Sequence, residues 1–155
     1  RQDIQRWAKR YGIPFVFPPT DPSRPGGIRQ DQVDSTRAHK AMFYANRQSQ
    51  GRAFAQALWS RTYAVGSFIG DEANLLASGQ AMGWQMTDML TFIASPEADE
   101  LYAEGQAHAH AQGVFGVPTM VLNGQMWWGN DRLGMLEDHL ASTFGKEADN
   151  MDTLR

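Results

Sequence analysis

A short polar motif, Asn130-Asp131-Arg132, stands where the last helix of the chain is expected to begin. The first turn of a helix has backbone N–H groups without intrahelical partners and carries the positive end of the helix dipole, so it can hold a carboxylate. The Asp131 side chain can pair with an ammonium group. Together these features match the head of an α-amino acid. The alternative is that Asn130 or Asp131 only caps the helix, which is worth about 1 kcal/mol.

A second motif, Val117-Pro118-Thr119, places a proline at the entrance of an expected strand, where proline is tolerated. Gly116 before it favours a tight turn in which the Val117–Pro118 bond can be cis. Such a turn leaves the backbone N–H and C=O of Val117 free to pair with an extended peptide. The alternative is an ordinary proline at a strand start. Taken together, the two motifs predict a groove for a short peptide with a free amino-acid head.

The elements around these motifs form a hairpin followed by a helix. Residues 119–122 and 125–128 predict two strands, and Asn123-Gly124 between them is a strong signal for a two-residue hairpin turn. Adjacent strand residues point to opposite faces, so one of Trp127 and Trp128 is expected in the core and the other beside a hydrophobic substrate. We assign Trp127 to the substrate pocket.

The rest of the chain reads as a helix, a short strand at residues 15–17, a proline-rich loop and a block of helices. Asp34 or Ser35 can cap the first helix of this block. The order predicts an α/β sheet domain with an all-helical insertion. The first helix has no cap and the strand no partner, so we expect a strand–helix–strand unit upstream of Arg1. Three tryptophans on helical stripes are expected in the core: Trp7, Trp59 and Trp84.

Composition excludes several classes of function. The 155 residues are 42% hydrophobic and 20% charged, which is typical of a globular domain. The net charge of −3 offers no basic surplus for nucleic acid or an anionic membrane. There is no cysteine, so the sequence holds no disulfide, CxxC pair or thiolate, which suits the cytoplasm. His108 and His110 fall on different faces of a helix, so we expect no metal site.

The C-terminal motifs carry a family resemblance. Phe115-Gly116-Val117-Pro118-Thr119, followed by Trp127-Trp128-Gly129-Asn130-Asp131-Arg132, resembles the 2-hydroxychromene-2-carboxylate isomerases, close relatives of the kappa-class glutathione transferases. Residues 3–8, with Gly12-Ile13-Pro14 and Phe17-Pro18, resemble the early helix of that family. The resemblance implies a single, partial thioredoxin-like domain with a DsbA-type all-helical insertion. Residues 1–19 and 113–145 would form the thioredoxin-like part and residues 34–112 the insertion, with the N-terminal strand–helix–strand missing.

The resemblance also implies glutathione as the cofactor. Val117 would pair with its cysteinyl unit beside a cis Pro118, and Arg132 would reach glutathione or a dimer partner. The protein would be a homodimeric isomerase in aromatic-compound catabolism, acting on a small aromatic, conjugated substrate. The implied glutathione-binding residues are Val117, Pro118, Trp128, Gly129, Asn130, Asp131 and Arg132.

Two departures from the family pattern limit this interpretation. The family's serine, which favours the thiolate of glutathione, has no counterpart here and would lie upstream of Arg1, so we name no catalytic residue. Asp21, in the loop 20–27, stands where the isomerases are expected to present an aromatic residue, which leaves the substrate open. Other readings remain: a kappa-class glutathione transferase, a DsbA-like thiol–disulfide oxidoreductase with its CxxC upstream, or a non-catalytic scaffold.

Overall fold

The computed structural model describes residues 2–17 and 34–152, with side chains described as far as residue 143. Asp21 and the loop around it lie outside the described residues. The chain divides into two compact units, Arg1–Glu104 and Gly105–Arg155. The predicted division into a thioredoxin-like part and an insertion stays a prediction. The α-helices and strands are α1 (Gln2–Tyr11), α2 (Thr36–Arg47), α3 (Gly51–Trp59), α4 (Glu72–Gln80), α5 (Met86–Ile93), α6 (Pro96–Ala111), β1 (Thr119–Leu122), β2 (Gln125–Trp128) and α7 (Leu133–Asp152).

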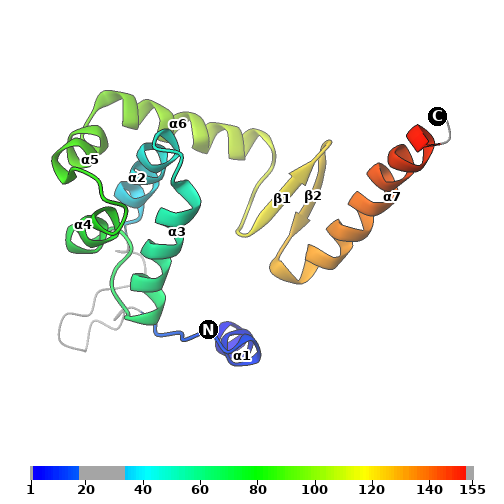
Figure 1. Ribbon diagram of the computed structural model, residues 1–155, viewed down its shortest axis with the longest axis horizontal. Coiled ribbons are helices and arrows are strands. Elements are labelled where there is room, and N and C mark those ends of the chain that lie inside the picture. The colour runs from blue at the N-terminus through cyan, green and yellow to red at the C-terminus, as the bar shows by residue number, and fades with distance from the viewer. Residues whose placement is uncertain (1, 18–33, 153–155) are drawn as a thin grey trace. The chain divides into compact units, whose positions relative to one another are not determined.

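The core of the first unit lies among α2, α3, α4 and α5, which form a bundle (Figure 1). Three alanines on one face of α2 are buried, and their small side chains let neighbouring helices approach closely. The core residues are Ala38, Ala41, Ala45, Phe54, Leu58, Leu75, Met89 and Ile93.

A buried polar network fixes the segment that follows α3. The chain continues from α3 into a π-helical turn, Ser60–Ala64, in which Thr62 is buried. Asn74 on α4 donates from its side-chain amide to Thr62 Oγ1 at 3.1 Å and to the Phe68 carbonyl at 3.0 Å. Its Oδ1 accepts from Arg61 Nε at 3.1 Å. Because every polar atom of the buried Asn74 amide is used, the π-helical turn is held to α4 at a defined position.

The structure corrects the predicted strand at residues 15–17. These residues are extended but are not part of a strand, and within the described residues the sheet has only β1 and β2. The Val16 N–H instead donates to the Tyr63 carbonyl, and the Phe15 ring stacks on the Tyr63 ring at 5.1 Å. A strand requires a neighbouring strand, whereas here the backbone partner belongs to a helical turn. The local sequence favours extension but cannot supply the partner.

Trp59 is a second correction. Its position on the apolar stripe of α3 predicted burial, yet the residue is 56% exposed. Trp84 is partly buried and packs on the core as expected. Its indole N–H donates to the Gln50 side chain. Trp7 is partly buried and stacks on Tyr11, although α1 has no fully buried residue.

Asp34 supports the start of α2, as one of the two capping alternatives predicted. Its Oδ1 accepts a hydrogen bond from the Thr36 backbone N–H at 2.8 Å, and this bond lowers the pKa of Asp34 below its ordinary value of 3.8. We expect Asp34→Ala to cost ~0.5–1 kcal/mol at neutral pH, since one N–H at the helix start loses its acceptor. Because the folded pKa is lowered, the difference should be full above about pH 4 and vanish as the pH falls through the lowered pKa. Urea unfolding at a series of pH values measures it, and a difference that persists at the acid end would contradict it.

The first turn of α6 is capped and tied to α2. Ser95 Oγ accepts a hydrogen bond from the Ala98 N–H at 3.2 Å and so caps the helix start before Pro96. Asp99 pairs with Lys40 of α2 at 2.6 Å.

None of the helices in the described part of the chain combines the length and the apolar character needed to cross a bilayer.

The second unit begins within α6 and consists mainly of the β1–β2 hairpin and α7 (Figure 1). The strands are antiparallel, with Thr119 opposite Trp128 and Leu122 opposite Gln125. This register leaves only Asn123 and Gly124 in the turn, with φ of 49° and 76°. The predicted two-residue turn is thus confirmed, and both φ values are positive, as a type I′ turn requires. A 3₁₀ turn, Asn130–Arg132, joins β2 to α7.

Candidate functional site

One hydrogen bond joins the two motifs singled out in the sequence. The Gly129 N–H donates to the Pro118 carbonyl at 2.9 Å, at the end of the hairpin where β1 begins and β2 ends. This bond places Val117-Pro118 beside Gly129 and the turn that follows it. The bond between Val117 and Pro118 is cis, one of the two forms that the sequence left open.

Val117 presents an open backbone edge. The residue is 88% exposed, and no hydrogen bond within the described residues uses its N–H or C=O. Thr119 Oγ1 donates to the Gly116 carbonyl at 2.5 Å and so fixes the turn on either side of Val117. An extended peptide can therefore pair with this edge without displacing an existing bond.

Trp128 forms an aromatic wall beside the same turn. Its ring lies 5.1 Å from the Phe115 ring, centre to centre, and both residues are more than half exposed. A Cβ added to Gly116 would stand 2.7 Å from Trp128 Nε1, so glycine is what lets the indole lie against the backbone here. Trp127 points to the opposite face of β2, 5.1 Å from the His139 ring. The structure thus brings Trp128, and not Trp127, to the other predicted site residues.

The turn from β2 into α7 carries the charged groups. Gly129 has φ of 104° and ψ of 149°, a backbone conformation that is essentially restricted to glycine. Asp131 and Arg132 are exposed, with 3.8 Å between Asp131 Oδ2 and Arg132 Nη1. The residue in the cap position is Gly129, and no side chain caps this turn. The capping role expected for Asn130 or Asp131 is therefore wrong, and the Asp131 carboxylate remains accessible.

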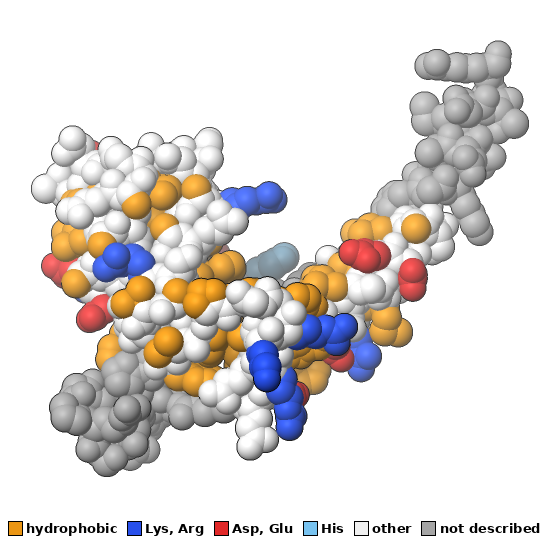
Figure 2. Space-filling model, turned by 60° about the horizontal axis from the view of Figure 1, so that its bottom comes forward, with side chains coloured by type: hydrophobic (Ala, Val, Ile, Leu, Met, Phe, Trp, Pro, Cys, Tyr) orange, Lys and Arg blue, Asp and Glu red, His pale blue; other side chains and the backbone are white. Residues whose placement is uncertain are grey.

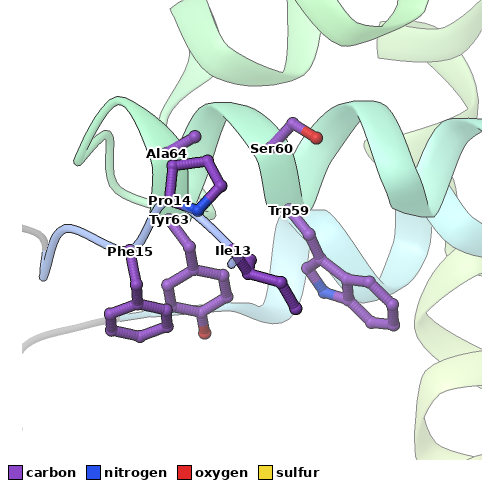
Figure 3. Close-up of a pocket in the computed structure, with 7 residues that line it drawn as sticks. All are labelled: Ile13, Pro14, Phe15, Trp59, Ser60, Tyr63 and Ala64. Carbon is purple, nitrogen blue, oxygen red and sulfur yellow. The ribbon is translucent and has the colours of Figure 1, made fainter. Parts of the chain in front are cut away.

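A hollow in the first unit was not anticipated from the sequence. It measures about 400 Å³ and is almost wholly apolar (Figure 3). Trp59 and Tyr63 project from the same side of the helical segment, and Ile13 and Phe15 come from the extended segment after α1 (Figure 3). We call this site the aromatic hollow; its lining residues are Ile13, Pro14, Phe15, Trp59, Ser60, Tyr63 and Ala64.

Metal chemistry has no ready site in the part of the chain that the structure describes. No group of three or more His, Asp or Glu side chains gathers there in a position to hold an ion.

Comparison with protein families assigns the fold. The family model of the DSBA-like thioredoxin domain matches residues 1–141. The chain belongs to this family. The match spans both units and confirms the predicted DsbA-like thioredoxin fold, which in the described residues is mostly helical with a two-stranded sheet.

Similar proteins share one name. The chain is 34% identical over 147 residues to the 2-hydroxychromene-2-carboxylate isomerase of Pseudomonas putida, covering 95% of this chain and 66% of that protein. It is 35% identical over 136 residues to the one from Pseudomonas sp. strain C18, covering 88% and 58%. The solved structure of a selenomethionine-labelled 2-hydroxychromene-2-carboxylate isomerase matches with a TM-score of 0.80 and 33% identity, covering 96% of this chain and 67% of the other. The chain thus spans two thirds or less of the curated relatives' length.

We call the group of residues around the start of β1 and the end of β2 the hairpin site; its residues are Val117, Pro118, Trp128, Gly129, Asn130 and Asp131. In this DSBA-like thioredoxin domain, the residues of the hairpin site could be predicted from the sequence, whereas those of the aromatic hollow could not. Asn123-Gly124 and Val117-Pro118 are local signals, so they could be recognised directly. The hollow combines residues 13–15 with residues 59–64, and nothing in either stretch shows that they meet. A weak signal did exist, because Trp59 and Tyr63 are four residues apart and so share a helix face.

Proposed function

We propose that this protein is a glutathione-dependent isomerase of the 2-hydroxychromene-2-carboxylate isomerase type, acting on a small aromatic, conjugated substrate in aromatic-compound catabolism. The observation that carries the proposal is the bond from Gly129 N–H to the Pro118 carbonyl. This bond places the unpaired backbone of Val117 next to the accessible carboxylate of Asp131, in the turn that leads into α7. The names of the relatives support the isomerase class.

The residues present suit glutathione. Its cysteinyl unit is an extended peptide, which matches the unpaired backbone of Val117. Its γ-glutamyl head carries an ammonium and a carboxylate. Asp131 can pair with the ammonium, while the backbone N–H groups of Asn130 and Asp131, at the first turn, can receive the carboxylate. Opposite charges are thus provided for both ends of the head group.

In the reaction, each of these residues has a positioning role. Bound glutathione supplies a thiol that, as thiolate, can add to a conjugated substrate and leave again after a bond has rotated. Pairing at Val117 fixes the cysteinyl unit, and therefore the sulfur, along one direction. Asp131 holds the far end of the peptide. The exposed ring of Trp128 covers apolar atoms between them and excludes water.

Asp131→Ala tests the proposal. Removing the carboxylate loses a charge-assisted contact with the ammonium, so we expect glutathione affinity to fall about tenfold, equivalent to ~1.4 kcal/mol. Isothermal titration calorimetry of parent and variant measures this. Asp138→Ala, which removes an exposed carboxylate from α7, is the matched control and should bind as the parent does. A parent without glutathione affinity, or equal losses in the two variants, would reject the glutathione site.

Product analysis separates the enzyme classes. With glutathione and 2-hydroxychromene-2-carboxylate, an isomerase converts the substrate without consuming the thiol, since the thiolate leaves again. A kappa-class transferase would accumulate a glutathione conjugate. A thiol–disulfide oxidoreductase would convert neither compound, and would form glutathione disulfide only when a disulfide substrate is added and reduced to its thiols. We further propose a cytoplasmic homodimer, as the resemblance implies, and sedimentation equilibrium checks its oligomeric state.

A further inference from the structure

We propose that the aromatic hollow binds the uncharged ring system of a planar aromatic ligand of one or two fused rings. This inference rests on the proposed function, because that function supplies an aromatic substrate for the site to recognise. It adds the place of recognition, in the helical unit, and the residues that do it: Trp59, Tyr63 and Ile13.

The size and chemistry of the hollow fit such a ligand. Its volume of about 400 Å³ falls in the range of ~300–1,000 Å³ typical of small-molecule sites. Three of its lining residues are aromatic, and two of them present ring surface to solvent: Trp59 is 56% exposed and Tyr63 37%. Aromatic rings favour offset-stacked or edge-to-face contact with other rings. A planar ring gains such contacts here, whereas a saturated ring of equal size gains only burial.

The walls of the hollow are held in place before any ligand arrives. The Phe15 and Tyr63 rings stack with only 13° between their planes. The backbone bond from Val16 to Tyr63 ties the extended segment to the π-helical turn. Thr62, within that turn, is held by Asn74. A π-helical turn is uncommon and often marks a functional position. Ligand binding at such fixed walls costs little ordering of side chains.

Charge determines which part of a substrate the hollow can take. No Lys, Arg, Asp or Glu is among its lining residues. Arg61 belongs to the same turn, but its Nε donates to Asn74. A carboxylate buried in this hollow would lose its hydration without gaining a cation. The hollow therefore selects for the apolar rings of a ligand and against its charged groups.

Exposed apolar surface alone does not identify a ligand site in this protein. Hydrophobic side chains are visible over much of one face of the molecule (Figure 2). Val65 is an exposed apolar residue, at 71%, that does not line the aromatic hollow. Trp59 also borders a second, smaller hollow of about 170 Å³ that includes Met42 and Leu58. That volume is below the usual size of a ligand site. Ile13 lines the larger hollow and not the smaller one, so it distinguishes the two.

The test uses 2-naphthol, an uncharged two-ring aromatic, in calorimetric titrations without glutathione. We expect the parent to bind it, Trp59→Ala to bind at least tenfold more weakly and Ile13→Ala about threefold more weakly. Tyr11→Ala removes an aromatic side chain that is 63% exposed and lines neither hollow, so it should bind as the parent does. Decahydro-2-naphthol, the saturated analogue, should bind at least fivefold more weakly than 2-naphthol.

Several results would overturn the inference. These are equal affinity in parent and Trp59→Ala, an effect of Trp59→Ala with none from Ile13→Ala, or equal binding of the saturated analogue. Equal affinity in parent and Trp59→Ala, or no effect of Ile13→Ala, would mean that the ligand binds elsewhere. Equal binding of the saturated analogue would mean that the hollow is only an apolar surface, of the kind that another polypeptide segment covers. Glutathione titration of Trp59→Ala keeps the two proposals separate. Lost naphthol binding with intact glutathione binding supports the hollow, whereas a parent that binds naphthol but no glutathione would reject the proposed function alone.

Discussion

Gly129→Ala is expected to weaken glutathione binding about 100-fold, the largest effect of any single substitution in the hairpin site. A side chain at φ of 104° and ψ of 149° is strained, which costs ~1–3 kcal/mol. A Cβ there would also collide with the carboxylate of Asp131. The collision displaces the group proposed to hold the ammonium, and the strain distorts the turn that presents the N–H groups. A change of 100-fold corresponds to ~2.7 kcal/mol.

Gly124→Ala is the matched control for this substitution. Gly124 also has a positive φ, of 76°, but a Cβ there would meet nothing within 4 Å. Gly124→Ala should therefore lose less stability in thermal unfolding than Gly129→Ala, because non-glycine residues can enter the left-handed region at a lower cost, and only Gly129→Ala should lose affinity in calorimetry. If the two variants lost glutathione affinity equally, backbone strain in the hairpin would explain the loss. Displacement of the Asp131 carboxylate would then not be its cause.

Most features of the hairpin could be predicted from short sequence motifs. Asn123-Gly124 fixes the turn type by itself, and the turn type fixes the register that sets Thr119 opposite Trp128. Pro118 at the strand entrance and Asp131 near the helix start could be recognised in the same way. The conformation of Gly129 could not, because the 3₁₀ turn that follows it depends on how β2 meets α7.

The helical unit shows where local sequence fails. Residues 15–17 have strand-forming side chains, yet their partner is the Tyr63 carbonyl, which no short-range pattern can supply. Trp59 is on the predicted apolar stripe, but α3 ends at this residue and the wider π-helical turn follows. The predicted burial of Trp59 fails where the chain leaves regular α-helical geometry. The two failures meet in space, since both segments line the aromatic hollow.

Asn74→Ala is expected to destabilise the protein by about 3 kcal/mol. The substitution removes the amide that serves Thr62, Phe68 and Arg61. The Thr62 hydroxyl is buried and would lose its partner. Each buried polar group left unsatisfied costs ~1–3 kcal/mol. Arg61 is exposed and can turn to water, so the main losses fall on the other two groups. Urea unfolding monitored by circular dichroism measures the change.

Ser78→Ala provides the comparison. Ser78 is as deeply buried as Asn74, but its hydroxyl makes a single bond, to the Asn74 carbonyl at 2.8 Å. That carbonyl sits in α4 and has a helical partner besides, so we expect a loss of at most about 1 kcal/mol. Equal losses in the two variants would mean that burial, and not the Asn74 network, sets the stability of this region.

The Asn74 variant also links stability to recognition. If the network holds the π-helical turn, then under conditions where Asn74→Ala is still folded, the turn should move and 2-naphthol affinity should fall with it. Ser78→Ala leaves the turn attached and should keep that affinity. The Asn74 side chain lines neither hollow, so a loss of affinity in its variant can only be transmitted through the position of Thr62 and the ring of Tyr63 beside it. That dependence distinguishes a fixed binding surface from an apolar face that any hydrophobic molecule could cover.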